Sequence, residues 1–75
     1  MKANIIAQFI RYDLAHETKL RIYENKQGLR GTLFDSYGRK IDGSMFYEKD
    51  RENTIYRVME YFGYTENNSY RIPNY

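Results

Sequence analysis

Hydrophobic and polar residues alternate along two neighbouring segments in the first half of the chain. Within residues 18–24 and again within residues 29–35, alternate positions are apolar or glycine, at Leu20, Ile22, Leu29, Gly31 and Leu33. A period of two is typical of a strand with one face on the core and the other in solvent. Residues 25–28 between the segments form a turn sequence that ends in glycine, so the pattern predicts an antiparallel hairpin.

Two further segments are predicted to be strands. Residues 44–48 follow two turn-forming dipeptides that end in Gly38 and Gly43; we expect one of them to be a tight turn and the other a bulge. Residues 4–12 have apolar side chains at helical spacing, but their three isoleucines, phenylalanine and tyrosine are typical of a strand. We favour the strand here, and a helix is the open alternative.

A helical pattern begins after Asp50, which is a suitable N-cap residue. Apolar residues recur at helical spacing in this segment, at Ile55, Val58, Met59 and Phe62. Gly63 follows directly, where a left-handed C-terminal cap belongs. These signals predict one helix close to the C-terminus.

Together the patterns predict an α+β fold: a small antiparallel β-sheet meander of three to four strands, with one C-terminal α-helix packed on one face. Residues 1–64 form the single domain, and residues 65–75 are a polar C-terminal tail that can pack back on the sheet through Tyr70 and Ile72. The predicted core residues are Leu20, Ile22, Leu29, Leu33, Ile55, Val58, Met59 and Phe62.

Composition limits the function classes. The chain has 75 residues, 41% hydrophobic and 29% charged, which is typical of one folded domain with one core. It has no cysteine, which excludes disulfides and thiolate metal sites. Its longest apolar cluster, within residues 5–10, is far shorter than the roughly 20 residues that span a bilayer, and it does not match a signal peptide. We therefore expect a cytoplasmic protein without a membrane partner.

Charge is divided unevenly along the chain. Residues 1–40 hold eight Lys or Arg and four Asp or Glu, whereas residues 41–75 hold four and six. If the apolar strand positions face the helix, cations and aromatic rings share the opposite face, and the turn after residue 35 extends this patch. The candidate binding residues are Lys19, Arg21, Tyr23, Arg30, Phe34, Tyr37, Arg39 and Lys40.

Cations that alternate with aromatic rings are suited to phosphates and bases, so the first hypothesis is a small non-enzymatic protein that binds DNA or RNA, of mobile-element or phage type. The order of a basic strand, the turn at residues 35–40, a strand and a helix is similar to the arm-binding domains of some phage and transposon integrases, over about residues 19–62. Such domains usually carry more Lys and Arg. The resemblance favours nucleic-acid binding and identifies no family.

The second hypothesis is a protein partner. Nine tyrosines are too many for so small a core, and exposed Tyr and Arg often anchor interfaces. The chain would then be a phage or mobile-element inhibitor that docks on a host nucleic-acid-binding protein, such as a CRISPR nuclease, as anti-CRISPR proteins do. Acidic residues on the helix side could imitate phosphates: Glu48, Asp50, Glu52, Glu60 and Glu66. An exposed edge strand could also pair two copies into a homodimer.

Catalysis has the weakest support. His16 is the only histidine and lies in a polar loop, where a surface role is far more common than a base or a ligand. The glycines form no phosphate-binding motif, and Asp50 is better explained as a helix cap. We therefore expect no enzyme activity, no catalytic residue, no metal and no cofactor.

Overall fold

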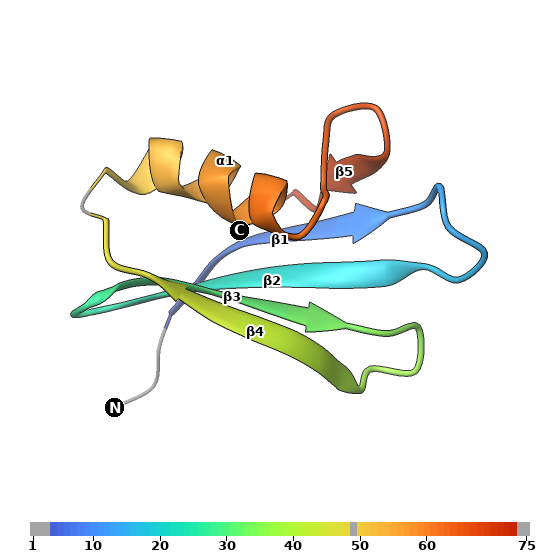
Figure 1. Cartoon of the computed structure of the whole chain (residues 1–75), viewed down its shortest axis with the longest axis horizontal. Coiled ribbons are helices and arrows are strands. Elements are labelled where there is room, and N and C mark those ends of the chain that lie inside the picture. Colours follow the sequence, from blue (N-terminus) through green and yellow to red (C-terminus); the bar gives the residue numbers. More distant parts are fainter. Residues whose placement is uncertain (1–3, 49, 74–75) are drawn as a thin grey trace.

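The computed structural model describes residues 4–48 and 50–73, which form a five-stranded antiparallel sheet and one helix (Figure 1). The elements are β1 (Asn4–Arg11), β2 (Thr18–Asn25), β3 (Gly28–Phe34), β4 (Lys40–Phe46), α1 (Arg51–Tyr61) and β5 (Ser69–Arg71). The strand order is β4-β3-β2-β1-β5. The predicted α+β class with a meander and a C-terminal helix is confirmed, but the sheet has five strands rather than three to four.

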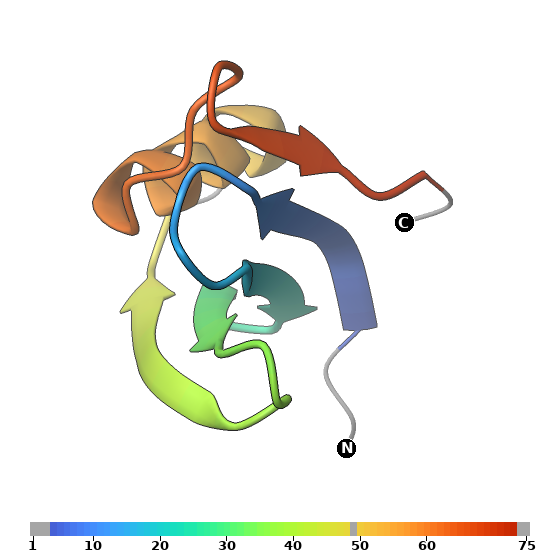
Figure 2. The same ribbon diagram turned by 90° about the vertical axis from the view of Figure 1, so that its right-hand side faces the viewer.

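The fifth strand comes from the polar segment that follows the helix. After α1 the chain reaches the far edge of the sheet, where β5 pairs with β1 (Figures 1 and 2). The Ile72 amide donates to the Gln8 carbonyl at 2.8 Å, and the Tyr12 amide donates to the Asn68 carbonyl at 3.0 Å. Backbone hydrogen bonds thus hold this segment in the sheet, and β1 becomes an inner strand rather than an edge.

The favoured reading of residues 4–12 is confirmed, because β1 is a strand. The β1–β2 pairing shifts register between Ile5 and Ala7, so one extra residue is inserted there. This bulge lets consecutive residues be buried: Ile6, Ala7, Gln8 and Phe9 are all less than 6% exposed. Inner-strand burial and the bulge together explain why this segment shows no strand alternation.

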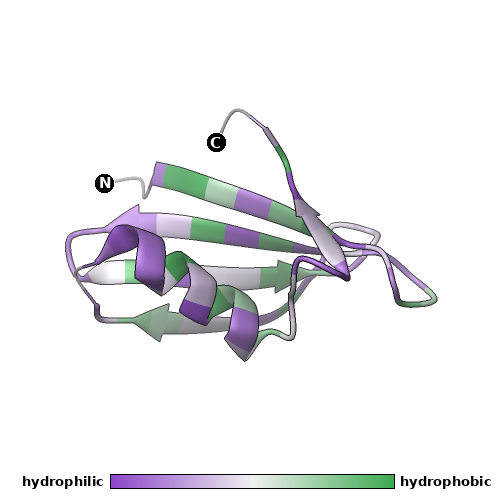
Figure 3. Cartoon of the chain, turned by 90° about the horizontal axis from the view of Figure 1, so that it is seen from above, coloured by the Kyte–Doolittle hydropathy of each residue, from purple (hydrophilic) through white to green (hydrophobic). Residues whose placement is uncertain are grey.

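The core lies between α1 and one face of the sheet. Its buried hydrophobic residues are Ile6, Ala7, Phe9, Leu20, Ile22, Leu29, Ile55, Val58, Met59 and Tyr64. Two predicted core residues, Leu33 and Phe62, are partly buried and pack against this cluster. Figure 3 shows the helix lying across the sheet and the alternation of hydrophilic and hydrophobic residues along the strands.

Helix α1 has the predicted ends. The Asp50 carboxylate accepts a hydrogen bond from the Asn53 amide at 3.3 Å, so Asp50 is the N-cap. Gly63 has a φ of 80° just past the last turn, as expected for a left-handed cap. None of the described helices is long and apolar enough to cross a membrane.

The β3–β4 connection differs from the prediction. Strand β4 begins at Lys40 rather than at residue 44, so Asp42 and Gly43 lie within the strand. The tight turn precedes it and contains Gly38, whose φ is 82°. A register shift in the pairing follows Leu33, opposite Asp42. Of the two glycine dipeptides, the first is therefore the turn and the second lies beside the bulge.

Candidate nucleic-acid interface

The sheet face that points away from α1, here called the outer face, is defined by strand register. Three rows of side chains cross it, each running from β1 through β2 and β3 to β4. The rows are Ile10–Lys19–Phe34–Lys40, Gln8–Arg21–Thr32–Gly43 and Ile5–Tyr23–Arg30–Met45. Residues that are separate in sequence thus become neighbours on one surface.

The outer face is basic without an opposing charge from the strands. Its rows contain four cations, Lys19, Arg21, Arg30 and Lys40, whereas the strands' two carboxylates belong to the rows that face α1. Glu24 lies opposite Leu29, and its carboxylate is 3.7 Å from the Arg51 guanidinium on the helix. The fold therefore separates positive from negative charge along the same strands.

Arg21 contacts two aromatic residues of the outer face, Tyr23 and Phe34. Its guanidinium donates to the Tyr23 hydroxyl at 3.3 Å, and its Cζ lies 4.9 Å from the centroid of the Phe34 ring. A guanidinium over a ring contributes about 0.5–1 kcal/mol at exposed sites. All three side chains are partly buried, so the cation and the rings form one fixed cluster.

Two more cations, Lys40 and Arg30, lie close to Gly43 in β4. A Cβ atom at this position would lie 3.3 Å from the Lys40 Cε and 3.5 Å from an Arg30 guanidinium nitrogen. Both side chains thus converge over the glycine on the outer face and are themselves exposed. Their charges are available to a ligand.

The middle row contains polar atoms that the protein does not satisfy. Gln8 and Thr32 are only 4% and 5% exposed, and Arg21 lies between them. Among the described residues, Gln8 Oε1 and Arg21 Nε have no hydrogen-bond partner. Leaving a buried polar group unpaired costs about 1–3 kcal/mol. Such groups concentrate where a protein gives up stability for function.

The β3–β4 turn closes one end of the outer face. The Asp35 carboxylate accepts hydrogen bonds from the Arg39 amide, the Tyr37 amide and the Arg39 guanidinium, all at 2.9 Å. The bonds from Arg39 are the main cause that lowers the pKa of the Asp35 carboxyl below its ordinary value. In Figure 2 this turn, in green, lies on the side of the sheet opposite α1.

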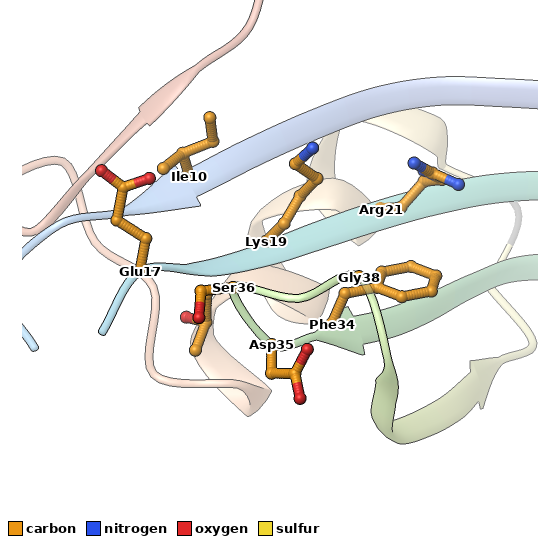
Figure 4. Close-up of a pocket in the computed structure, with 9 residues that line it drawn as sticks. Ile10, Glu17, Lys19, Arg21, Phe34, Asp35, Ser36 and Gly38 are labelled. Carbon is orange, nitrogen blue, oxygen red and sulfur yellow. The ribbon is translucent and has the colours of Figure 1, made fainter.

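A pocket of about 350 Å³ lies between this turn and the sheet (Figure 4). Its lining comes from β1, β2, the end of β3, the loop before β2 and the turn: Ile10, Glu17, Thr18, Lys19, Arg21, Phe34, Asp35, Ser36 and Gly38. Figure 4 shows Phe34 and Arg21 at one end, with Ile10 and Glu17 at the other. The pocket combines an aromatic wall with two cations, Lys19 and Arg21, and two carboxylates, Glu17 and Asp35.

The structure brings most of the predicted binding residues together. Lys19, Arg21, Tyr23, Arg30, Phe34 and Lys40 share the outer face. Tyr37 and Arg39 lie on the turn instead, where the Arg39 guanidinium stacks 5.3 Å from the Tyr37 ring centroid. The Arg39 charge is offset by Asp35, whereas the Tyr37 side chain is 80% exposed.

Several residues of the site were missed from the sequence. Gln8, Ile10 and Met45 belong to β1 and β4, and no sequence signal gives the register of these strands. Glu17 and Ser36 are in loops that fold over the pocket. The face on which Glu24 lies could have been predicted, because Glu24 follows Leu20 and Ile22 at the same two-residue spacing.

A second surface lies on the helix side. Tyr47, Tyr56 and Tyr61 are 58–72% exposed, and Glu52 and Glu60 are exposed on α1 between them in sequence. One nearby acid, Glu48, is paired with Arg57 at 2.8 Å. This surface carries aromatic rings and charges of both signs, because Arg51 and Arg57 are also exposed on α1, whereas the charges of the outer face are all positive on its strands.

The groups that could serve catalysis or hold a metal ion are one histidine and the carboxylates. His16 is exposed in the loop between β1 and β2. No group of three or more histidine or carboxylate side chains in residues 4–48 and 50–73 is placed to hold a metal ion.

Comparison with protein-family models, with curated proteins and with solved structures gave no match.

Proposed function

We propose that this protein binds nucleic acid through the outer face of its sheet. The observation that carries the proposal is the set of four cations on this face, without a strand carboxylate among them. Lys and Arg that neutralise phosphates supply most of the affinity for nucleic acids. Phosphate contacts would fix the position of the ligand, and Tyr23 and Phe34 would contact bases or sugars.

The arrangement differs from an ordinary solvated sheet face in two ways. Such faces usually mix charges of both signs in cross-strand pairs, whereas here Glu24 and Asp42 face the helix side. An ordinary face also exposes its polar side chains, whereas Gln8 and Thr32 are buried in the middle row. The outer face therefore has features of a binding surface, and the proposal gives the protein no catalytic role.

The test is the binding of labelled short DNA and RNA, as single strands and duplexes, at about 50 and 200 mM salt. The first variant is Arg30→Ala/Lys40→Ala, which removes two exposed cations from the outer face. Its matched control is Arg51→Ala/Arg57→Ala, which removes two exposed cations from α1. Both variants lower the net charge by the same amount, so only the position of the charge differs.

We expect affinity to fall steeply with salt. Each phosphate contact contributes about 0.7 to 0.9 to the slope of log affinity against log salt. The outer-face variant should therefore weaken binding and reduce this slope by about 1.5, while the helix variant should leave it unchanged. Equal effects of the two variants would show that binding follows net charge rather than this face.

The absence of binding at low salt would reject the nucleic-acid proposal. The alternative is then an inhibitor that docks on a host nucleic-acid-binding protein, such as a CRISPR nuclease. One specific observation favours it, namely the exposed tyrosines beside acidic residues on the helix side. Aromatic anchors with carboxylates can occupy a site that normally receives phosphate and base. Binding to such a nuclease should then depend on Tyr56 rather than on Arg30.

A further inference from the structure

We infer that the ligand is a single strand, and that one of its bases enters the pocket between β2 and the β3–β4 turn. This inference rests on the proposed function and adds the kind of nucleic acid and the place of the base. Its starting point is that the pocket, at about 350 Å³, is within the size range of small-ligand sites, near its lower end. The outer face is thus not a flat platform at this end.

The pocket lining matches the parts of a nucleotide. Phe34 and Ile10 supply apolar walls for the faces of a base, and Arg21 lies over the Phe34 ring at 4.9 Å. Aromatic rings and guanidinium planes are the surfaces on which unpaired bases stack. Phe34 is partly buried, so its position is fixed before the ligand arrives.

Polar groups line the rest of the pocket. Glu17 and Ser36 can pair with donors on the edge of a base, and Lys19 can contact the adjacent phosphate. The Asp35 carboxylate is already engaged by the turn, so it shapes the wall rather than binding. The Watson–Crick edge and the faces of a base are free only when the base is neither paired nor stacked.

The row pattern provides a path for the rest of the strand. Lys19, Phe34 and Lys40 follow one another across three strands, and Arg30 converges with Lys40 over Gly43. A chain that leaves the pocket along this row meets cations at Lys40 and Arg30. The basic row and the pocket therefore form one continuous site.

A duplex fits this surface poorly. The turn at residues 35–39 lies on the outer side of the sheet, next to the pocket (Figures 2 and 4). Stacked and paired bases could enter the pocket only by flipping out, which requires unpairing and unstacking. A duplex could contact Arg30 and Lys40 through its phosphates, but it would leave the pocket empty.

The experiment compares one single-stranded sequence with its own duplex, as DNA and as RNA, at one low salt concentration. Phe34→Leu removes the aromatic face but keeps an apolar side chain, and Phe34→Tyr restores the ring. Phe46→Leu is the matched control, because Phe46 is a partly buried ring that packs on the core side of the sheet. Ser36→Phe fills the pocket from an exposed turn position, so it tests the pocket without disturbing the core.

We expect the single strand to bind at least about tenfold more tightly than the duplex. Loss of one base–aromatic stack should weaken single-strand binding by about tenfold in Phe34→Leu and Ser36→Phe. Duplex binding should not change in either variant, and Phe34→Tyr and Phe46→Leu should bind like the original protein. A strand labelled with 2-aminopurine should lose fluorescence on binding, because stacking quenches this base, and it should do so less in Phe34→Leu.

The two proposals fail in different ways. If salt-dependent binding requires Arg30 and Lys40 but single strand and duplex bind equally, the base pocket is wrong and the proposed function stands. If Ser36→Phe, which leaves Phe34 in place, binds the single strand normally, the pocket is again wrong. If neither DNA nor RNA binds in any form, both proposals are wrong.

Discussion

Replacing Gly31 with alanine tests how closely the helix approaches the sheet. A Cβ atom at this position would lie 2.5 Å from Val58 Cγ1 and 2.8 Å from Phe62 Cε2. Carbon atoms normally pack at about 3.5–4.0 Å, so α1 would have to move by about 1 Å. Val58 is fully buried against the sheet, and a valine in a helix has one strongly preferred rotamer.

We expect Gly31→Ala to destabilise the protein by about 1–3 kcal/mol, as overpacked cores do. For a chain of this size, that corresponds to a decrease in Tm of roughly 5–20 °C. The measurement is thermal unfolding followed by circular dichroism. Gly43→Ala is the control, because its added methyl group meets the flexible end of Lys40 at 3.3 Å and should change stability by less than about 0.5 kcal/mol.

Equal and small effects of the two substitutions would refute the close contact between α1 and β3. The comparison also separates stability from function. Gly31 faces the helix, whereas Gly43 is part of the outer face. While Gly31→Ala remains folded, its nucleic-acid affinity should therefore match that of the original protein.

Three further changes test the cap, the buried polar row and the core tyrosine. Asp50→Ala removes the acceptor of the Asn53 amide and should lower stability by about 1 kcal/mol in urea unfolding; no change would contradict the cap. Gln8→Met removes an unpaired buried oxygen and should raise the free energy of unfolding by about 1 kcal/mol, so a lower Tm would contradict it. Burial raises the pKa of the Tyr64 hydroxyl, which also bonds Thr18 at 2.8 Å. In the unfolded chain this tyrosine ionises near pH 10, before it does so in the folded protein. The stability that comes from burying the neutral Tyr64 hydroxyl is therefore complete below that pH and is lost above it. Tyr64→Phe should make urea midpoints between pH 9 and 11 less dependent on pH, and an unchanged dependence would oppose this assignment.

Local patterns were enough to predict the central hairpin and the helix. Strands β2 and β3 each bury one face, so their apolar residues alternate and the phase is visible in the sequence. Helix α1 has an apolar stripe, a carboxylate cap and a terminal glycine. Each of these elements buries only one face, so its own residues show the apolar spacing that predicts it.

Other elements depend on neighbours that the sequence does not identify. Strand β1 lies between β2 and β5, and its bulge buries four consecutive residues. Strand β5 has only three residues, Ser69–Arg71, and is held mainly by backbone pairing with β1. Neither burial on both faces nor backbone pairing leaves a period-two pattern, so β5 was missed and β1 stayed ambiguous.

The candidate site was likewise predictable only in part. Alternation places Lys19, Arg21 and Tyr23 on one face, and the structure confirms this arrangement. The faces of β4 could not be assigned from the sequence, because the register shift next to Asp42 changes which of its residues face the helix. The pocket depends on the turn at residues 35–39, whose direction follows from hydrogen bonds to Asp35 that no sequence pattern specifies.

The net charge of the whole chain is a poor guide to what this protein can bind. It is only +2, yet the outer face carries four cations and the acids of the strands point the other way. Charges at a surface act over about 8 Å at physiological salt, so a ligand at the outer face responds to these cations and to Glu17 and Asp35 at the pocket rather than to the acids near α1. A partner at the helix side would meet Tyr56 and exposed carboxylates instead. The two sides of the sheet thus differ, because the outer face has four cations and no strand carboxylate whereas α1 exposes two arginines and two glutamates, and substitutions confined to one side test which of them a ligand uses.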